Sequence, residues 1–317
     1  MQSRLLNSAT FTYTARIDTG WSDPVTALSL TDGKLSDAQA AQYWEDGYLC
    51  PIPIMDSAEA QQWRDELESI EAAHPDGSLP SPLAQYLRVN TSVVMPLAAR
   101  LAADRRILDV VEGILGPNLL VWGAEFFDKA AHSDKIVSMH QDLTYWGLGA
   151  TSKQVTAWLA LSPATPESGC MATVRGSHKN AILPHEDTFA DDNLLSRGQE
   201  VQVDVDEADK AYLALQPGQM SLHHGLAIHG SGPNTSDDRR LGFAIRFIAP
   251  DVVQNDADRD YAMLVRGVDL HRNFLLYAPP ADNFTPASLE LYARIRDDQA
   301  AALAKGAAKE VKMYSSS

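Results

Sequence analysis

The feature that most constrains the fold is a series of short β-type segments between Leu119 and Pro250. Each segment is rich in branched or aromatic side chains, and Gly, Pro or Asp residues separate it from the next. Eight such segments joined by turns predict a mainly β chain with a double-sheet jelly-roll core. The predicted strands are Leu119–Phe127, Ile136–Gln141, Gln154–Leu161, Cys170–Val174, Val201–Val205, Ala211–Leu215, Gln219–His223 and Leu241–Ile248.

Helix signals flank this region on both sides. Ser36 and Gln39 form a capping box that opens a short helix, and Asp56 and Asp104 are N-caps of two further helices. An amphipathic segment near the end of the chain predicts a last helix. We expect a single domain over residues 1–317, with a helical N-terminal part at about 36–116, the jelly-roll core at about 119–250 and a helical C-terminal part at about 287–305.

The charge balance limits the kinds of partner. The 317 residues carry 26 basic and 42 acidic side chains, a net charge of −16, which argues against nucleic acid and anionic membranes as partners. A small anionic ligand held by a few arginines is compatible with it. The two cysteines, Cys50 and Cys170, cannot form a disulfide scaffold, and we see neither a secretory signal nor a membrane-spanning segment. We expect a cytoplasmic protein with a small-molecule substrate; its oligomeric state is open, and a homodimer is one option.

The first chemical signal is His140-Gln141-Asp142. Residues two apart on a strand share a face, so His140 and Asp142 point the same way and Gln141 points oppositely. A divalent metal needs a third ligand, and two histidines with one carboxylate form the facial triad of non-haem iron(II) oxygenases. Taken alone, the pattern also describes a surface histidine beside an aspartate. Three histidines follow downstream, at His223, His224 and His229.

The second signal is the strand that begins at Arg240. Alternation places Leu241, Phe243, Ile245 and Phe247 on one face and Arg240, Gly242, Ala244 and Arg246 on the other. Arginine beside Gly and Ala indicates a roomy, positive face, which suits a guanidinium fork that holds a carboxylate. The alternative is a solvent-facing side of the strand, on which the arginines are surface charges.

Several motifs in this order resemble the phytanoyl-CoA dioxygenase family, and the resemblance covers most of the chain. They are Tyr43-Trp44-Glu45-Asp46-Gly47-Tyr48, His140-Gln141-Asp142, Trp158, Gly169-Cys170-Met171 with Gly176-Ser177-His178-Lys179, His229-Gly230-Ser231 with Asn234, and Arg240 eleven positions after His229. The resemblance implies a double-stranded β-helix (cupin-like) and an oxygenase that uses Fe(II), 2-oxoglutarate and O₂.

The resemblance also implies the metal ligands. His140, Asp142 and His229 would bind Fe(II), and His229 is chosen because the His-Gly-Ser element and the spacing to Arg240 belong to it. Asp142 fills the position that halide takes in halogenating relatives, so hydroxylation with release of succinate and CO₂ is implied. The roles of His223, His224 and Arg246 are left open.

For the cosubstrate, the resemblance implies that Arg240 pairs with the distal carboxylate of 2-oxoglutarate. Ser231 would assist it and Trp158 would flank it, with Gln141 as a weaker candidate.

Five residues are candidates for the substrate. Arg175 stands where the family usually has proline, and it either faces a substrate anion or is a surface arginine in a turn. Lys129 either reaches an anion or is solvated. The other three, Thr144, Tyr145 and Trp146, follow the His-x-Asp motif and would lie at the mouth of the site. We expect a small polar or zwitterionic metabolite; an acyl-CoA or a natural-product intermediate is the alternative, and the acidic composition disfavours the CoA ester.

Two other classes of function compete with the oxygenase. A zinc-dependent hydrolase would use the same three metal ligands and a glutamate base such as Glu167 or Glu186, but it assigns no role to Arg240. A non-catalytic jelly-roll binding protein would keep the histidines and the aspartate as a structural remnant.

Overall fold

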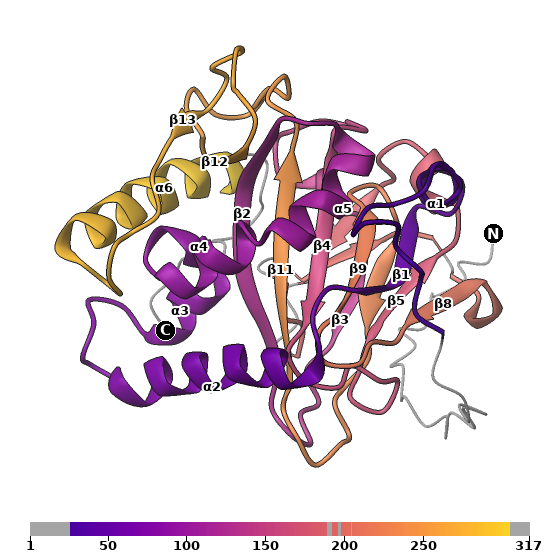
Figure 1. Cartoon of the computed structure of the whole chain (residues 1–317), viewed down its shortest axis with the longest axis horizontal. Coiled ribbons are helices and arrows are strands. Elements are labelled where there is room, and N and C mark those ends of the chain that lie inside the picture. The colour runs from indigo at the N-terminus through magenta and orange to yellow at the C-terminus, as the bar shows by residue number, and fades with distance from the viewer. Residues whose placement is uncertain (1–25, 189–191, 196–197, 204, 305–317) are drawn as a thin grey trace, which may run out of the picture.

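Two β-sheets facing each other form the centre of the molecule (Figure 1). The computed structural model describes residues 26–188, 192–195, 198–203 and 205–304. The large sheet has the order β1-β9-β4-β11-β2-β12-β13 and the small sheet the order β3-β10-β5-β8, while β6 and β7 form a separate pair. This confirms the prediction of a mainly β chain with a jelly-roll core and flanking helices.

The bounds of the strands are β1 Tyr48–Pro53, β2 Leu119–Lys129, β3 Val137–His140, β4 Gln154–Ala160, β5 Met171–Val174, β6 His185–Asp187, β7 Gln199–Val201, β8 Lys210–Leu213, β9 Gln219–His224, β10 His229–Ser231, β11 Arg240–Ile248, β12 Tyr261–Arg266 and β13 Leu275–Leu276. The helices are α1 Asp37–Asp46, α2 Ser57–Ala73, α3 Leu83–Arg88, α4 Pro96–Ala102, α5 Arg105–Leu115 and α6 Pro286–Ala304.

The predicted helix starts are confirmed. Gln39 donates its backbone N–H to the Ser36 hydroxyl, and its side chain accepts from the Ser36 N–H, so the capping box opens α1. Asp56 caps α2 and Asp104 caps α5, each by accepting a backbone N–H. The last predicted helix corresponds to α6, and residue 305 lies outside the described residues.

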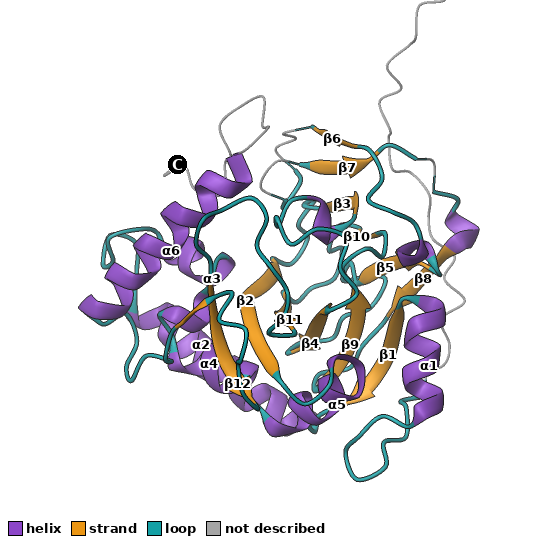
Figure 2. Cartoon of the chain, turned by 90° about the horizontal axis from the view of Figure 1, so that it is seen from above, coloured by secondary structure: helices purple, strands orange, loops and turns teal. Residues whose placement is uncertain are grey.

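The helices cover one face of the large sheet, and the small sheet lies against the other (Figure 2). Strand β11 shows why the two faces differ. Its apolar side chains, among them Phe243, Ile245 and Phe247, are fully buried in one cluster with residues of α2, α4 and α5. Arg240 and Arg246 lie on the opposite face, toward the small sheet, as the alternation predicts. The polar face of β11 therefore lines the space between the sheets.

The predicted and observed strands differ in places: β1, for example, is not among the predicted strands, and one predicted strand does not form. β1 contains Pro51 and Pro53 and lies at the edge of the large sheet, where proline is tolerated, so its sequence carries little strand signal. The predicted strand over Val201–Val205 is wrong, because β7 ends at Val201 and Val203 is exposed. No helix within the described residues is both long enough and apolar enough to cross a membrane.

Candidate active site

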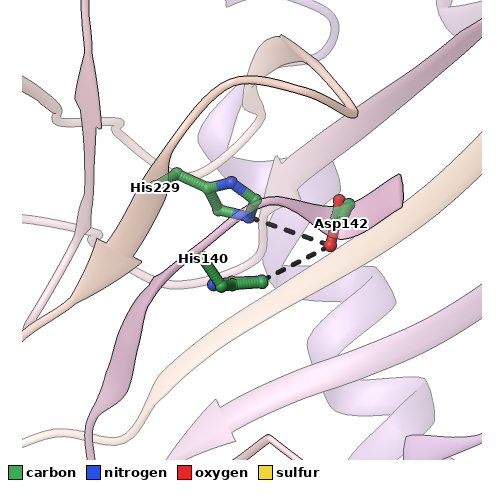
Figure 3. Close-up of side chains that lie close together, drawn as sticks. All are labelled: His140, Asp142 and His229. Carbon is green, nitrogen blue, oxygen red and sulfur yellow. Dashed lines mark ion pairs between the residues drawn. The ribbon is translucent and has the colours of Figure 1, made fainter. Parts of the chain in front are cut away.

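Three side chains converge where the small sheet opens toward the large one (Figure 3). His140 ends β3 and His229 begins β10, and the antiparallel register places these two residues directly opposite each other. Asp142 follows β3 in a short 3₁₀ turn. Its Oδ1 lies 3.4 Å from Nε2 of His140 and 4.0 Å from Nε2 of His229. One ligand atom from each residue lies within 4.8 Å of the others, close enough for one metal ion to bind all three.

Backbone contacts orient both imidazoles for metal binding. Nδ1 of His140 lies 2.9 Å from the carbonyl of Ser138, and Nδ1 of His229 lies 3.0 Å from the carbonyl of Ala227. A carbonyl only accepts, so each Nδ1 carries the proton, and the lone pair of each Nε2 faces Asp142. Binding of a metal through Nε2 requires this tautomer, in which Nε2 carries no proton.

The second oxygen of Asp142 is held from the side of the large sheet. Oδ2 accepts from Thr156 Oγ1 at 3.3 Å and lies 3.5 Å from Nε2 of His223. Burial raises the pKa of Asp142, but the neighbouring imidazoles of His140, His223 and His229 outweigh it and hold this pKa well below its usual range. Burial also lowers the pKa of His229. An ionised carboxylate and neutral imidazoles are the donor set that a divalent iron site requires, so these residues fit such an ion.

An inner chamber extends from this cluster between the sheets; its lining includes His140, Asp142, Trp158, His229, Ser231 and Arg240. The guanidinium of Arg240 is buried, donates to the Gly169 carbonyl at 2.6 Å, and lies 5.3 Å from the Trp158 ring centre. Gly242 makes room for that ring, because a Cβ at this position would come within 1.9 Å of it. Burial lowers the pKa of Arg240 to about 10, so the group stays cationic at neutral pH.

An outer chamber shares His140, Asp142 and Arg246 with the inner one; its lining includes Arg88, Trp122, Glu125, Tyr145, Trp146 and Arg246. Arg246 forms an ion pair with Glu125, and both side chains are largely buried. The Arg246 guanidinium also lies 4.7 Å from the ring centre of Trp146, which packs against Trp122. Tyr145 and Trp146 therefore lie where the sequence places them, at the mouth of the metal cluster.

Other candidates lie elsewhere. The side chain of Gln141 is fully buried and bonds to backbone groups of Leu183 and Leu226, so it braces loops and does not face a cosubstrate. Arg175 is a surface residue, with 64% of its side chain exposed, that pairs with Asp46 outside both chambers. The Thr144 hydroxyl faces His185 and not a chamber.

Lys129 is neither solvated nor near the outer chamber. Its side chain is buried beside Ser231, at the Arg240 end of the inner chamber. The structure therefore contradicts the alternative that Lys129 is a solvated lysine.

The two histidines whose roles the sequence left open, His223 and His224, lie in different surroundings. His223 lines the inner chamber beside Asp142, whereas His224 packs against Trp44 and His178 and accepts the Leu226 backbone N–H. The glutamates considered as hydrolase bases, Glu167 and Glu186, line neither chamber.

The sequence missed several residues of the outer chamber. Asp260 accepts hydrogen bonds from Trp122 Nε1, Gln254 and Gln299, and Gln299 also binds Asn90. These residues come from β2, from the segment before β12 and from α6, which no short motif links. Arg88 and Asn90 share one short segment, but an arginine two positions before an asparagine is not specific enough to indicate a site.

Comparisons with known proteins agree with this geometry. The family model for phytanoyl-CoA dioxygenase (PhyH) matches residues 43–242. Human peroxisomal phytanoyl-CoA dioxygenase is 24% identical over 70% of this chain and 71% of its own length. Ectoine dioxygenase of Sphingopyxis alaskensis is 26% identical over 76% of this chain and 84% of its own.

A solved structure is also similar. The non-heme monooxygenase ThoJ, in its apo form, superposes with a TM-score of 0.73 and 32% identity, covering 84% of this chain and 98% of ThoJ. The family match spans well over half of the sequence and contains all three residues of the metal cluster. The chain therefore belongs to the phytanoyl-CoA dioxygenase family and is a 2-oxoglutarate-dependent non-haem iron dioxygenase.

Proposed function

We propose that this dioxygenase hydroxylates an unactivated C–H bond of a small polar or zwitterionic metabolite that bears a carboxylate. The observation that carries the proposal is the outer chamber, which opens onto the metal ligands and is lined by paired charges and aromatic rings. The substrate would lie in this chamber and present one carbon to the metal.

His140, Asp142 and His229 would hold Fe(II), and the inner chamber would hold 2-oxoglutarate with its distal carboxylate on Arg240. When bound, Fe(II) and 2-oxoglutarate supply the oxidation by O₂, with release of succinate and CO₂. The protein supplies three ligands on one face, a guanidinium fork for the cosubstrate, and Trp158 as a wall that keeps water away from it.

The charges in the outer chamber argue for a polar substrate. Arg246 is paired with Glu125, and the guanidinium of Arg88 donates to the Leu194 carbonyl while its buried Nε has no hydrogen-bond partner among the described residues. A fatty acyl chain would place methylene groups against these polar groups, and desolvating them without new hydrogen bonds is costly. A substrate with a carboxylate beside Arg246 and a cationic or donor group beside Glu125 would give both side chains further hydrogen-bond partners.

Part of the outer chamber lies beyond the part of the chain that the family model matches. Arg246, Gln254, Asp260 and Gln299 all follow residue 242. The buried Asp260 carboxylate ties three of these walls together through Trp122, Gln254 and Gln299. We infer that this C-terminal portion contributes to substrate specificity together with outer-chamber residues of the matched region such as Glu125.

The proposal can be tested with purified protein under anaerobic conditions. Fe(II) and 2-oxoglutarate together are expected to produce a visible metal-to-ligand charge-transfer band, and candidate substrates are expected to shift it. Admission of O₂ should then release succinate in proportion to hydroxylated product. If no band appears with Fe(II) and 2-oxoglutarate, the proposed site is wrong.

The role of Arg246 predicts discrimination between carboxylates and their amides. The double variant Glu125→Gln/Arg246→Met removes both charges of the buried pair, so it avoids leaving one charge unpaired. We expect wild-type enzyme to prefer a carboxylate substrate over the matched amide by roughly 10- to 100-fold in kcat/KM, because a hydrogen bond to a charged group is worth about 1.5–3 kcal/mol. In the double variant this preference should disappear.

Arg175→Ala is the matched control, since Arg175 lies outside both chambers. It should keep the preference of the wild type. Equal rates for the carboxylate and the amide with wild-type enzyme would contradict a substrate anion on Arg246.

His223 gives a separate prediction for the metal. Its Nε2 lies 3.5 Å from the Asp142 oxygen that faces away from His140 and His229, so it orients this ligand. His223→Phe is expected to weaken Fe(II) binding by roughly 10- to 100-fold, the usual effect of losing an outer partner of a metal ligand. Competition with a chelator measures this affinity. His224→Phe is the control, and equal affinities of the two variants would exclude the role of His223.

We also propose a cytoplasmic location and small molecules as the partners. The two free thiols and the net charge of −16 support these assignments.

A further inference from the structure

Two basic side chains lie opposite each other at the Arg240 end of the inner chamber. Lys129 ends β2 and Arg240 begins β11, and the antiparallel register makes them direct partners. Lys129 is 1% exposed and Arg240 is 3% exposed. Neither forms an ion pair with a carboxylate of the described part of the chain. Like charges directly opposite each other destabilise a sheet, and burial increases the cost, so both groups can be charged together only when an anion lies beside them.

Lys129 contacts Ser231, one of the residues proposed to bind the cosubstrate. Its Nζ donates to the Ser231 hydroxyl at 2.7 Å, to the Ser231 carbonyl at 3.4 Å and to the Gly232 carbonyl. These three acceptors match the three N–H groups of a protonated lysine. The Ser231 hydroxyl lines the inner chamber with Arg240, whereas Lys129 lies behind it.

The protonation of Lys129 decides which way the Ser231 hydroxyl points. With the ammonium form, all three N–H groups donate, the Ser231 oxygen accepts, and its own proton is directed to the chamber. With the neutral amine, only two N–H groups donate and the nitrogen has a lone pair. The two carbonyls take both donors, so the Ser231 proton turns back toward the lysine. Only the first arrangement offers a donor to a carboxylate in the chamber.

We propose that Lys129 is a positioning residue for 2-oxoglutarate, which takes up a proton when the distal carboxylate binds and thereby turns the Ser231 hydroxyl toward it. This inference rests on the proposed function, because it assumes 2-oxoglutarate in the inner chamber.

The electrostatic surroundings favour a neutral lysine before the cosubstrate binds. Burial, and then the charge of Arg240, lower the pKa of Lys129 to about 6. Arg88 acts in the same direction, whereas the Cys170 thiol opposes it. Asp128 raises the pKa of Arg240 and so helps to keep that guanidinium charged. A carboxylate beside Arg240 and Ser231 would reverse the balance and raise this pKa.

The sign of the pH dependence follows. Below about pH 6, Lys129 is already protonated in the free protein, so its contribution to 2-oxoglutarate affinity is largest there. Above that pH, binding must also take up a proton, and the dissociation constant of 2-oxoglutarate should rise by up to about tenfold per pH unit, until the pKa of the complex is reached.

Calorimetry measures this coupling without turnover. 2-Oxoglutarate is titrated into anaerobic Fe(II)-loaded protein at pH 8, in buffers that differ in ionisation enthalpy. The slope of the observed enthalpy against the buffer enthalpy gives the protons taken up, and we expect about one for the wild type. Lys129→Met should take up none, and its 2-oxoglutarate affinity should no longer fall with pH. Lys153→Met, a change at an exposed lysine paired with Asp251, should behave as the wild type.

A second comparison tests whether Lys129 acts through the Ser231 hydroxyl or by direct attraction between its charge and the distal carboxylate of 2-oxoglutarate. At pH 6.5, Lys129→Met should weaken 2-oxoglutarate binding by roughly tenfold, while the rate at saturating 2-oxoglutarate stays near that of the wild type. In a Ser231→Ala background, Lys129→Met should weaken 2-oxoglutarate binding much less. An equal loss of affinity in both backgrounds would overturn the inference that Lys129 acts through Ser231.

The wild type alone can also overturn the inference. Tight 2-oxoglutarate binding with no proton uptake, and no change in affinity between pH 6.5 and 8.5, would do so even if Lys129→Met fails to fold. A protein that does not bind 2-oxoglutarate at all would instead refute the proposed function.

Discussion

Asp142→Ala is expected to abolish hydroxylation and to release Fe(II). Asp142 is the single charged ligand of the cluster, and His140, His223 and His229 all lie within 4.0 Å of its carboxylate oxygens. Even an outer partner of a metal ligand is worth about 10- to 100-fold in affinity or activity, so losing the ligand itself should cost more than about 100-fold. Succinate release and Fe(II) binding under anaerobic conditions measure the two effects.

The fold should survive this change, because Asp142 lies after β3 and its side chain takes no part in the backbone pairing of β3 with β10. Thermal unfolding should therefore be close to that of the wild type. Asp65→Ala, an exposed change on α2, should leave activity intact. Full turnover by Asp142→Ala would refute the assignment of the three ligands.

Arg240→Ala is expected to raise the 2-oxoglutarate requirement by roughly 30- to several-thousand-fold, because truncating one partner of a buried, hydrogen-bonded charge pair costs about 2–5 kcal/mol. The guanidinium is buried beside Trp158. Arg240→Lys keeps the charge but loses the fork, so it should fall between the alanine variant and the wild type. The dissociation constant of 2-oxoglutarate, read from the charge-transfer band, checks both variants.

Arg239→Ala provides the neighbouring control, since Arg239 pairs with Glu71 of α2 on the other side of the sheet. Its 2-oxoglutarate affinity should be unchanged. If Arg240→Ala also binds 2-oxoglutarate normally, the distal carboxylate lies elsewhere, and Arg246 becomes the first candidate to test.

The alternation of β11 shows what a sequence can predict about this fold. A half-buried strand repeats every two residues, so the pattern alone assigns Phe243 and Ile245 to one face and Arg240 and Arg246 to the other. The helix caps at Ser36, Asp56 and Asp104 are equally predictable, since a cap is a contact between neighbours in the chain. β10 is not, because three residues, His229–Ser231, carry too little pattern.

The proposed iron ligands came from motif order, and the structure explains why separate motifs meet. The β3–β10 register brings His140 opposite His229, although 89 positions separate them. Arg175 and Arg246 illustrate the limit of this reasoning. Arg175 follows β5 and Arg246 lies within β11, and either could face a substrate anion from its place in the sequence. Arg175 pairs with Asp46 at the surface, whereas Arg246 pairs with Glu125 inside the outer chamber.

The sequence by itself determined the β-rich core, the caps of its flanking helices, and the residues proposed for the metal and the cosubstrate, because these depend on local periodicity and on short motifs. The tertiary structure alone decided which charges are buried and which partners they meet. Lys129 faces Arg240, and Asp260 joins β2 to α6, only once distant strands and helices pack. Desolvation and charge pairing depend on that packing, so substrate recognition and the state of Lys129 were beyond the reach of any single segment.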